Sequence, residues 1–249
     1  MRRNKIPSFL TFCLGLLLVA GLLEAAGALK GDRLVFPTVP DILRAFARLL
    51  AAPRTWQQIG TTLGHLILSM GISTLLGVAI GLAEGLCPFL RQLLRPLMTL
   101  LRSLPMIVLI IIIMVLSAYR RVPVLAGCFV LTPLISEAAC EGCLRADPEL
   151  MDVWRLNSRL NAQVLFRVYL PLMAGYLRQS YINAAGMGLK LAVSAEYLVQ
   201  TRDSLGKAVY SSVYFNEYAD VYAYALIMVA LVLLITEAPL LLTRVLKKP

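Results

Sequence analysis

The chain has 249 residues, of which 59% are hydrophobic and 15% are charged, and its mean hydropathy is +0.77. Soluble domains are about 45–50% apolar and about 25% charged, so this composition excludes a soluble domain and indicates an integral membrane protein. The net charge of +10 does not indicate nucleic-acid binding, because the basic residues flank apolar runs and do not form one patch. Membrane lipid is the expected partner of these charges.

Residues 1–58 are predicted to contain one anchor and one surface helix. A bilayer core about 30 Å thick needs about 20 apolar residues per spanning helix. Residues 8–29 satisfy this length after a basic start, so we interpret residues 1–35 as an uncleaved anchor. Residues 36–58 are expected to form an external interfacial segment. Within it, residues 40–50 predict a short helix on the membrane surface. Its expected apolar face consists of Ile42, Leu43, Phe46, Leu49 and Leu50.

Residues 59–249 are predicted to hold five further spans, which gives about six in an all-α polytopic protein. The second span, residues 59–86, carries glycines at positions 77, 81 and 85, whose spacing lets another helix approach closely. His65 within it is expected to be a packing or interfacial residue. A short basic turn with Arg91 and Arg95 follows and leads to the third span, residues 101–116. Pro105 is expected to kink or break that helix.

The fourth span, residues 122–144, contains Glu137 and Glu141 one helical turn apart. Two interpretations stay open for this pair: a proton or cation site, or an ion pair with arginines of the loop that follows. Cys140 and Cys143 form a CxxC in the same span, without a second pair or a nearby histidine. We therefore expect small packing residues and neither a metal site nor a redox site. The five cysteines imply no disulfide framework, because they are odd in number and lie in or beside apolar runs.

The fifth span, residues 173–198, is unusually polar and contains Asn183, Lys190 and Glu196. A helix of this kind is poorly suited to facing lipid, so it is expected to face the interior of the protein. A tyrosine-rich connection, residues 201–220, leads to the sixth span at residues 221–242. With the N-terminus inside, 14 basic residues fall in cytosolic segments and 9 in outer ones, which favours cytoplasmic N- and C-termini.

A polar and basic stretch at residues 147–171, DPELMDVWRLNSRLNAQVLFRVYLP, separates the fourth and fifth spans. It resembles the coupling loop of bacterial ABC-importer permeases, whose motif is Glu-Ala-Ala, three residues, Gly, nine residues, then Ile-x-Leu-Pro. Asp152, Val153 and Trp154 occupy the Glu-Ala-Ala positions and Ser158 the glycine position. Val168, Leu170 and Pro171 occupy the closing positions. The spacing is kept, whereas Trp154 and Ser158 depart from the motif.

Other segments are similar to the permeases for nitrate, sulfonate, taurine and pyrimidine precursors. These segments are VPDILRAF, RSLPMIVL, DPEL, AEYL and SLGKAV, in that order along the chain. The resemblance implies a type I ABC importer permease fold in the cell inner membrane. It also implies three kinds of partner: an ABC ATPase subunit, an extracytoplasmic substrate-binding protein, and a second permease as a homodimer or heterodimer. The sequence has no GxxxxGK[ST] phosphate loop, so we expect no enzyme activity here and ATP hydrolysis in the separate subunit.

The resemblance implies that a coupling loop within residues 145–172 docks a short helix in a groove of the ATPase. An apolar stripe with polar flanks suits such a contact. The residues expected to take part are Glu149, Asp152, Val153, Trp154, Arg155, Ser158, Arg159, Leu170 and Pro171. Trp154 is the expected anchor, because large aromatics dominate such interfaces. The alternative is that Trp154 lies at the lipid interface.

The resemblance places the pathway between two permease chains, lined by the third and fifth spans. The candidate pathway residues are Pro105, Asn183, Lys190 and Glu196. Lys190 fits an anionic substrate, and its alternative role is a structural ion pair with Glu196 or with a glutamate of the fourth span. A secondary transporter that uses Glu137, Glu141 and Lys190 as a relay is the competing function, although no internal repeat is visible.

Overall fold

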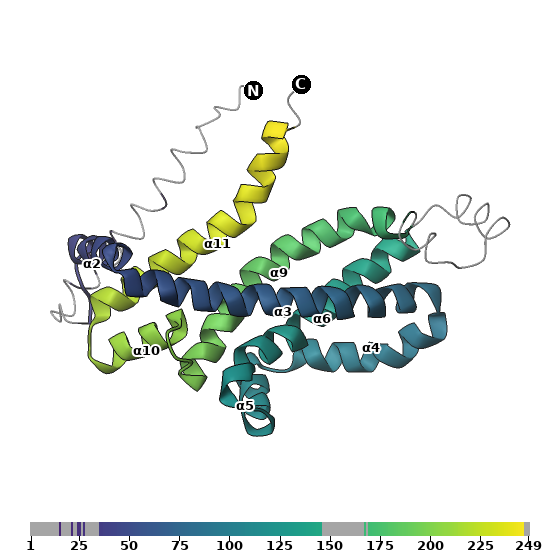
Figure 1. Cartoon of the computed structure of the whole chain (residues 1–249), viewed down its shortest axis with the longest axis horizontal. Helices are drawn as coiled ribbons and strands as arrows, with labels where there is room; N and C mark the ends of the chain where they lie inside the picture. Colours follow the sequence, from purple (N-terminus) through teal and green to yellow (C-terminus); the bar gives the residue numbers. More distant parts are fainter. Residues whose placement is uncertain are drawn as a thin grey trace.

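The computed structural model describes residues 35–145 and 170–246, together with isolated positions between 15 and 27 and at 167 and 169. Every regular element in these described ranges is helical, and Figure 1 shows the helices running side by side in an elongated bundle. This confirms the predicted all-α class. The elements are α2 (Val39–Ala51), α3 (Pro53–Leu86), α4 (Pro88–Ser103), α5 (Met106–Leu116), the 3₁₀ turn η1 (Tyr119–Arg121), α6 (Val122–Leu144), α9 (Leu170–Val199), α10 (Leu205–Tyr214) and α11 (Tyr218–Leu246).

Three stretches of the described ranges are long and apolar enough to cross a membrane: Pro53–Leu86, Tyr119–Leu144 and Tyr218–Thr236. The pair α4 and α5 makes a fourth if it is counted as one broken span. α9 is 30 residues long but too polar to be counted by composition. The expected first span lies outside the described residues except for isolated positions between 15 and 27.

The broken span has its bend at the predicted proline. α4 and α5 meet at 103°, with Leu104 and Pro105 between them in extended conformations. Proline supplies no N–H and pushes the residue before it out of the helical region, which explains a break at this position. The prediction of a kink or break at Pro105 is confirmed.

The basic turn expected after α3 is instead the 16-residue helix α4. Pro88, which looks like a turn residue in the sequence, lies in the first turn of α4, where a missing N–H costs nothing. Pro96 is accommodated within the helix. The prediction of a short turn was wrong because both prolines were compatible with a helix.

The glycines of α3 allow α6 to pack directly against it. A Cβ on Gly77 would lie 2.9 Å from the Cβ of Ile135, and one on Gly85 would lie 2.5 Å from the Cβ of Cys143. A Cβ on Gly81 would overlap the carbonyl oxygen of Ser136. The predicted close helix contact is confirmed, with α6 as the partner and Cys143 as one of its packing residues.

α2 packs on the start of α11 as part of one apolar cluster. Ile42, Ala45 and Leu49 are its buried residues, whereas Leu43 is 55% exposed. The helix predicted at residues 40–50 is therefore present, but its buried face is rotated from the predicted one. Arg48 also forms an ion pair with Asp220 of α11, which fixes α2 at the end of the bundle that carries α10 (Figure 1).

Candidate functional site

The exposed face of α9 is polar along much of its length. Gln179, Asn183, Lys190 and Ser194 are all exposed, and their spacing puts them on one side of the helix. The Nε2 atom of Gln179 donates to the Oδ1 atom of Asn183 at 3.5 Å, and the hydroxyl of Ser194 donates to the carbonyl oxygen of Lys190 at 2.9 Å. We call these four residues the α9 polar stripe. Such residues in a membrane helix face water or protein in preference to lipid.

Lys190 forms no ion pair with any residue that the structure describes. Its expected alternative partners are Glu196 and the two glutamates of the fourth span, Glu137 and Glu141. Glu196 is bonded to other groups, and Glu137 forms an ion pair with Arg102 of α4. The described geometry therefore contains no structural ion pair for Lys190.

Glu196 lies on the opposite, buried side of α9 and has no exposed surface. One carboxylate oxygen accepts from the hydroxyl of Thr62 at 2.8 Å and from the backbone N–H of Gly206 at 3.2 Å. The other oxygen lies 2.7 Å from Nδ1 of His65. A buried carboxylate needs several donors to offset its lost hydration, and these three provide them.

The same network fixes the N-terminus of α10 against α3 and α9. The hydroxyl of Thr62 also accepts from the N–H of Leu205, and Ser204 caps α10 by accepting from the N–H of Lys207. Gly206 is required there, since a Cβ would lie 2.5 Å from the Cβ of Glu196 and from the carbonyl oxygen of Val193. A carboxylate near the first turn of a helix is also favoured by the helix dipole.

Sequence reasoning singled out Glu196 but not the residues bound to it. His65, expected to be a packing or interfacial residue, is its partner across 131 positions of the chain. The available signal was the Ser-Leu-Gly that follows Glu196 after seven further residues. Serine is typical of a helix N-cap, and glycine is typical of a position where another part of the chain packs closely against the backbone. The Thr62 and His65 contacts have no local sequence signal.

A polar cavity of about 590 Å³ lies between the end of α3, α4 and α6. It is lined by both glutamates of the fourth span, together with Glu84 and three arginines of α4. Glu137 pairs with Arg102 of α4 at 2.5 Å, so its partner among the described residues belongs to the helix before the fourth span. Arg155 and Arg159 of the loop after that span lie outside the described residues. No group of three or more histidine, cysteine, aspartate or glutamate side chains in the described residues could hold a metal ion.

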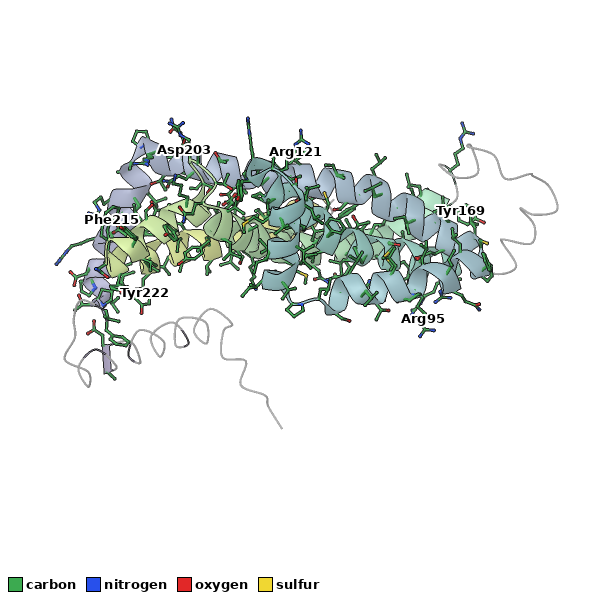
Figure 2. All side chains as sticks on the ribbon, turned by 90° about the horizontal axis from the view of Figure 1, so that it is seen from below. Arg95, Arg121, Tyr169, Asp203, Phe215 and Tyr222 are labelled. Carbon is green, nitrogen blue, oxygen red and sulfur yellow. The ribbon has the colours of Figure 1, made fainter. Side chains whose placement is uncertain are left out.

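The Glu196 network and the polar cavity lie toward opposite ends of the bundle. Figure 2 shows Asp203 and Phe215 toward the end that carries α10, and Arg95 and Tyr169 toward the other end. α6 ends and α9 begins at this second end (Figure 1). The described residues on either side of the predicted coupling segment therefore lie toward the same end as the polar cavity.

Most of the predicted coupling residues fall outside the described part of the chain. These are Glu149, Asp152, Val153, Trp154, Arg155, Ser158 and Arg159. Leu170 and Pro171 are described and exposed, and they form the first turn of α9, where proline is well tolerated. Pro105, the remaining pathway candidate, is exposed at the bend between α4 and α5.

Comparisons with known proteins agree with this architecture. A protein family described as "Binding-protein-dependent transport system inner membrane component" matches residues 73–248. Among solved structures, the MetNI methionine ABC transporter in inward-facing conformations has a chain with a TM-score of 0.62 and 18% sequence identity. The match covers 79% of this chain and 99% of that one, so the two share a fold. No curated individual protein sequence matches.

Proposed function

Because the chain belongs to the family of inner membrane components of binding-protein-dependent transport systems, we propose that it is the pathway-forming permease of an ATP-driven importer. An ABC ATPase subunit supplies the energy, and an extracytoplasmic binding protein delivers the solute. The protein lies in the inner membrane, and both termini are proposed to be cytoplasmic, in keeping with the distribution of basic residues.

The α9 polar stripe is the observation that carries this proposal. A single membrane chain with an exposed row of amide, ammonium and hydroxyl groups needs a polar surface opposite that row. A second permease supplies it when two α9 helices face each other across a hydrated pathway. The partner is a second copy of this chain or a related permease, and the polar stripe fits both arrangements.

The substrate class is proposed to be a small anion or a molecule with an anionic group, such as a sulfonate, taurine or nitrate. Lys190 supports this choice because its ammonium is exposed on the stripe and unpaired with any described residue. A cation without a fixed partner in a membrane pathway attracts anions. Asn183 is proposed to line the same pathway, and Pro105 to shape it at the bend of the broken span.

Glu196 is assigned a structural part in this proposal, because its carboxylate is enclosed between α3, α9 and α10. The secondary-transporter alternative has less support. It needs Glu137, Glu141 and Lys190 in one relay, whereas the two glutamates line a cavity between α3, α4 and α6 and Lys190 belongs to the α9 polar stripe.

Uptake by proteoliposomes tests the pathway proposal. The permease would be reconstituted with the ATPase and binding protein encoded beside it, and ATP-dependent uptake of labelled sulfonates and nitrate would be measured. Lys190→Met is expected to lower uptake of the transported anion by about tenfold, the change for loss of one charge-assisted contact of about 1.4 kcal/mol. Uptake that survives Lys190→Met at normal affinity would contradict the role of Lys190.

Lys207→Met is the matched control for this experiment. Lys207 lies in the first turn of α10, where its backbone N–H donates to the Ser204 cap. Its ammonium forms no ion pair with any residue in the described ranges. Removing its ammonium changes the net charge of the chain by the same amount. We expect wild-type uptake from this variant, so a shared loss in both variants would indicate a general charge effect.

A further inference from the structure

The polar cavity between α3, α4 and α6 has walls of opposite charge. One wall carries carboxylates and the other carries guanidinium groups, and about 590 Å³ of space lies between them. The carboxylates are Glu84, Glu137 and Glu141, and the guanidinium groups are Arg91, Arg95 and Arg102. Since the formal charges of the two walls are equal in number, the empty cavity has no strong preference for a simple anion or a simple cation.

The basic wall is built into the sequence of α4. Its three arginines follow one another at intervals of four and seven residues, which puts them on one face of the helix. The opposite face carries Leu93, Leu97 and Leu100, all of which are about half exposed or more. α4 therefore turns its charged face toward the cavity and its apolar face outward, as expected for a helix that borders lipid on one side and a polar site on the other.

Only part of this charge is neutralised within the protein. Arg102 forms an ion pair with Glu137 at 2.5 Å and also donates to the carbonyl oxygen of Pro133 at 2.7 Å. Within the described residues no other ion pair crosses the cavity, although Arg91, Arg95 and Glu141 also line it. Arg95 also lines the cavity, and its side chain points outward from α4 in Figure 2, which puts it at the rim.

Glu84 is the group that most needs a ligand. Its residue is only 7% exposed, and the hydroxyl of Ser136 donates to Oε2 at 3.1 Å. No described cation lies within ion-pair distance of it. A carboxylate with one neutral donor keeps much of its desolvation cost, and an ammonium group entering the cavity would remove that cost.

We propose that this cavity binds a small zwitterion, with its ammonium group against Glu84 and Glu141 and its anionic group against Arg91 and Arg102. A sulfonate, carboxylate or phosphate group fits the arginines, since guanidinium groups bind such oxyanions with two parallel hydrogen bonds. Two sources share this chemistry: a free solute such as an aminosulfonate, and the head group of phosphatidylethanolamine. The first source rests on the proposed function, whereas the second does not.

Binding to the purified full-length chain in lipid nanodiscs tests the proposal without ATP or transport. Taurine is the soluble probe, and ethanesulfonate and ethylamine are its two halves. Discs of phosphatidylglycerol alone test the solute, and native mass spectrometry of discs that also contain phosphatidylethanolamine tests the head group. A chain that fails to transport still gives an answer here, so failure of this proposal and failure of the proposed function are distinguishable.

Two variants and one control decide the outcome. Glu84→Gln keeps the shape of the side chain and is expected to lower the affinity for the zwitterion by about tenfold or more. This is the change for one lost charge-assisted hydrogen bond. Arg91→Gln combined with Arg95→Gln, on the exposed part of α4, is expected to do the same without a folding cost. Glu217→Gln, an exposed glutamate just before α11, is expected to bind normally.

Taurine binding that depends on Glu84, with both halves bound far more weakly, supports the free solute. Retained phosphatidylethanolamine that is lost in Glu84→Gln, with no taurine binding, supports the head group. The proposal is overturned if neither ligand separates the cavity variants from Glu217→Gln, or if taurine binds and ethanesulfonate binds as tightly.

Discussion

Glu196 shows how one charged residue can organise a helix connection inside a membrane protein. Its carboxylate joins α3 through Thr62 and His65 and joins α10 through the N–H of Gly206. All of these groups depend on the same two oxygens. The network therefore fixes where α10 begins relative to the two long helices.

Replacing Glu196 with alanine is expected to destabilise the protein strongly. The Thr62 hydroxyl, the His65 ring and the Gly206 N–H would all lose their acceptor in a buried site, at a total cost of about 3 kcal/mol. The measurement is the apparent melting temperature of the purified protein in detergent. Glu217→Ala, at an exposed position, is expected to leave it unchanged. Equal melting temperatures for both variants would show that the Glu196 network contributes little.

This residue also shows what the sequence could predict and what it could not. The polarity of residues 173–198 predicts that one side of the helix avoids lipid, and α9 does carry a polar stripe. Which polar residues are exposed was not predictable, because it depends on contacts such as the one from Glu196 to Thr62, 134 positions away. Asn183 and Lys190 lie on the exposed side, whereas Glu196 lies on the buried side.

The glycines of α3 let α6 pack closely against it. The three glycines of α3 meet Ile135, Ser136 and Cys143 of α6 closely enough that an added Cβ would overlap them. A close helix contact at this face was predictable, because the spacing of Gly77, Gly81 and Gly85 puts all three glycines on one side of the helix. Its partner was not, since several other spans have a comparable apolar composition.

A Gly81→Ala substitution is expected to lower stability, because the new methyl group would overlap the backbone of α6 and force the helices apart. Overpacking of this kind costs about 1–3 kcal/mol. Gly71→Ala on the same helix is the control, since a Cβ there meets nothing within 4 Å and alanine favours helix. The comparison is made by thermal unfolding in detergent. If Gly81→Ala unfolds at the same temperature as Gly71→Ala, α3 and α6 do not pack as described.

α4 is the element that sequence reasoning missed. Two prolines within nine residues favour a turn, and only the structure shows that one lies in the first turn and the other inside a continuous helix. The polar cavity could not be predicted without α4, because the cavity needs the arginines of α4 on one helical face. The break at Pro105 was predictable, since it rests on the local geometry of proline alone.

At the scale of the whole molecule, the described helices form the fold of a permease chain with polar features at both ends. The Glu196 network lies toward the end that carries α10, and the polar cavity lies toward the end where α6 and α9 are connected (Figures 1 and 2). With the proposed orientation, the cavity end is cytosolic and borders the coupling segment. Energy from an ATPase would enter the bundle at this end, next to the broken span.

The central claim is that residues 147–171 couple this permease to a separate ATPase, and Trp154 tests it most directly. The measurement is ATP-dependent uptake by proteoliposomes that contain the permease, the neighbouring ATPase and the binding protein, with the amount of co-purified ATPase recorded. Trp154→Ala is compared with Trp56→Ala, whose exposed indole donates to the carbonyl oxygen of Leu50 far along the chain from this segment. We predict that Trp154→Ala loses ATPase association and lowers uptake by about tenfold or more, because loss of an aromatic anchor costs about 2 kcal/mol. Trp56→Ala is expected to retain ATPase association and uptake. Wild-type uptake and full ATPase retention in Trp154→Ala would contradict the account.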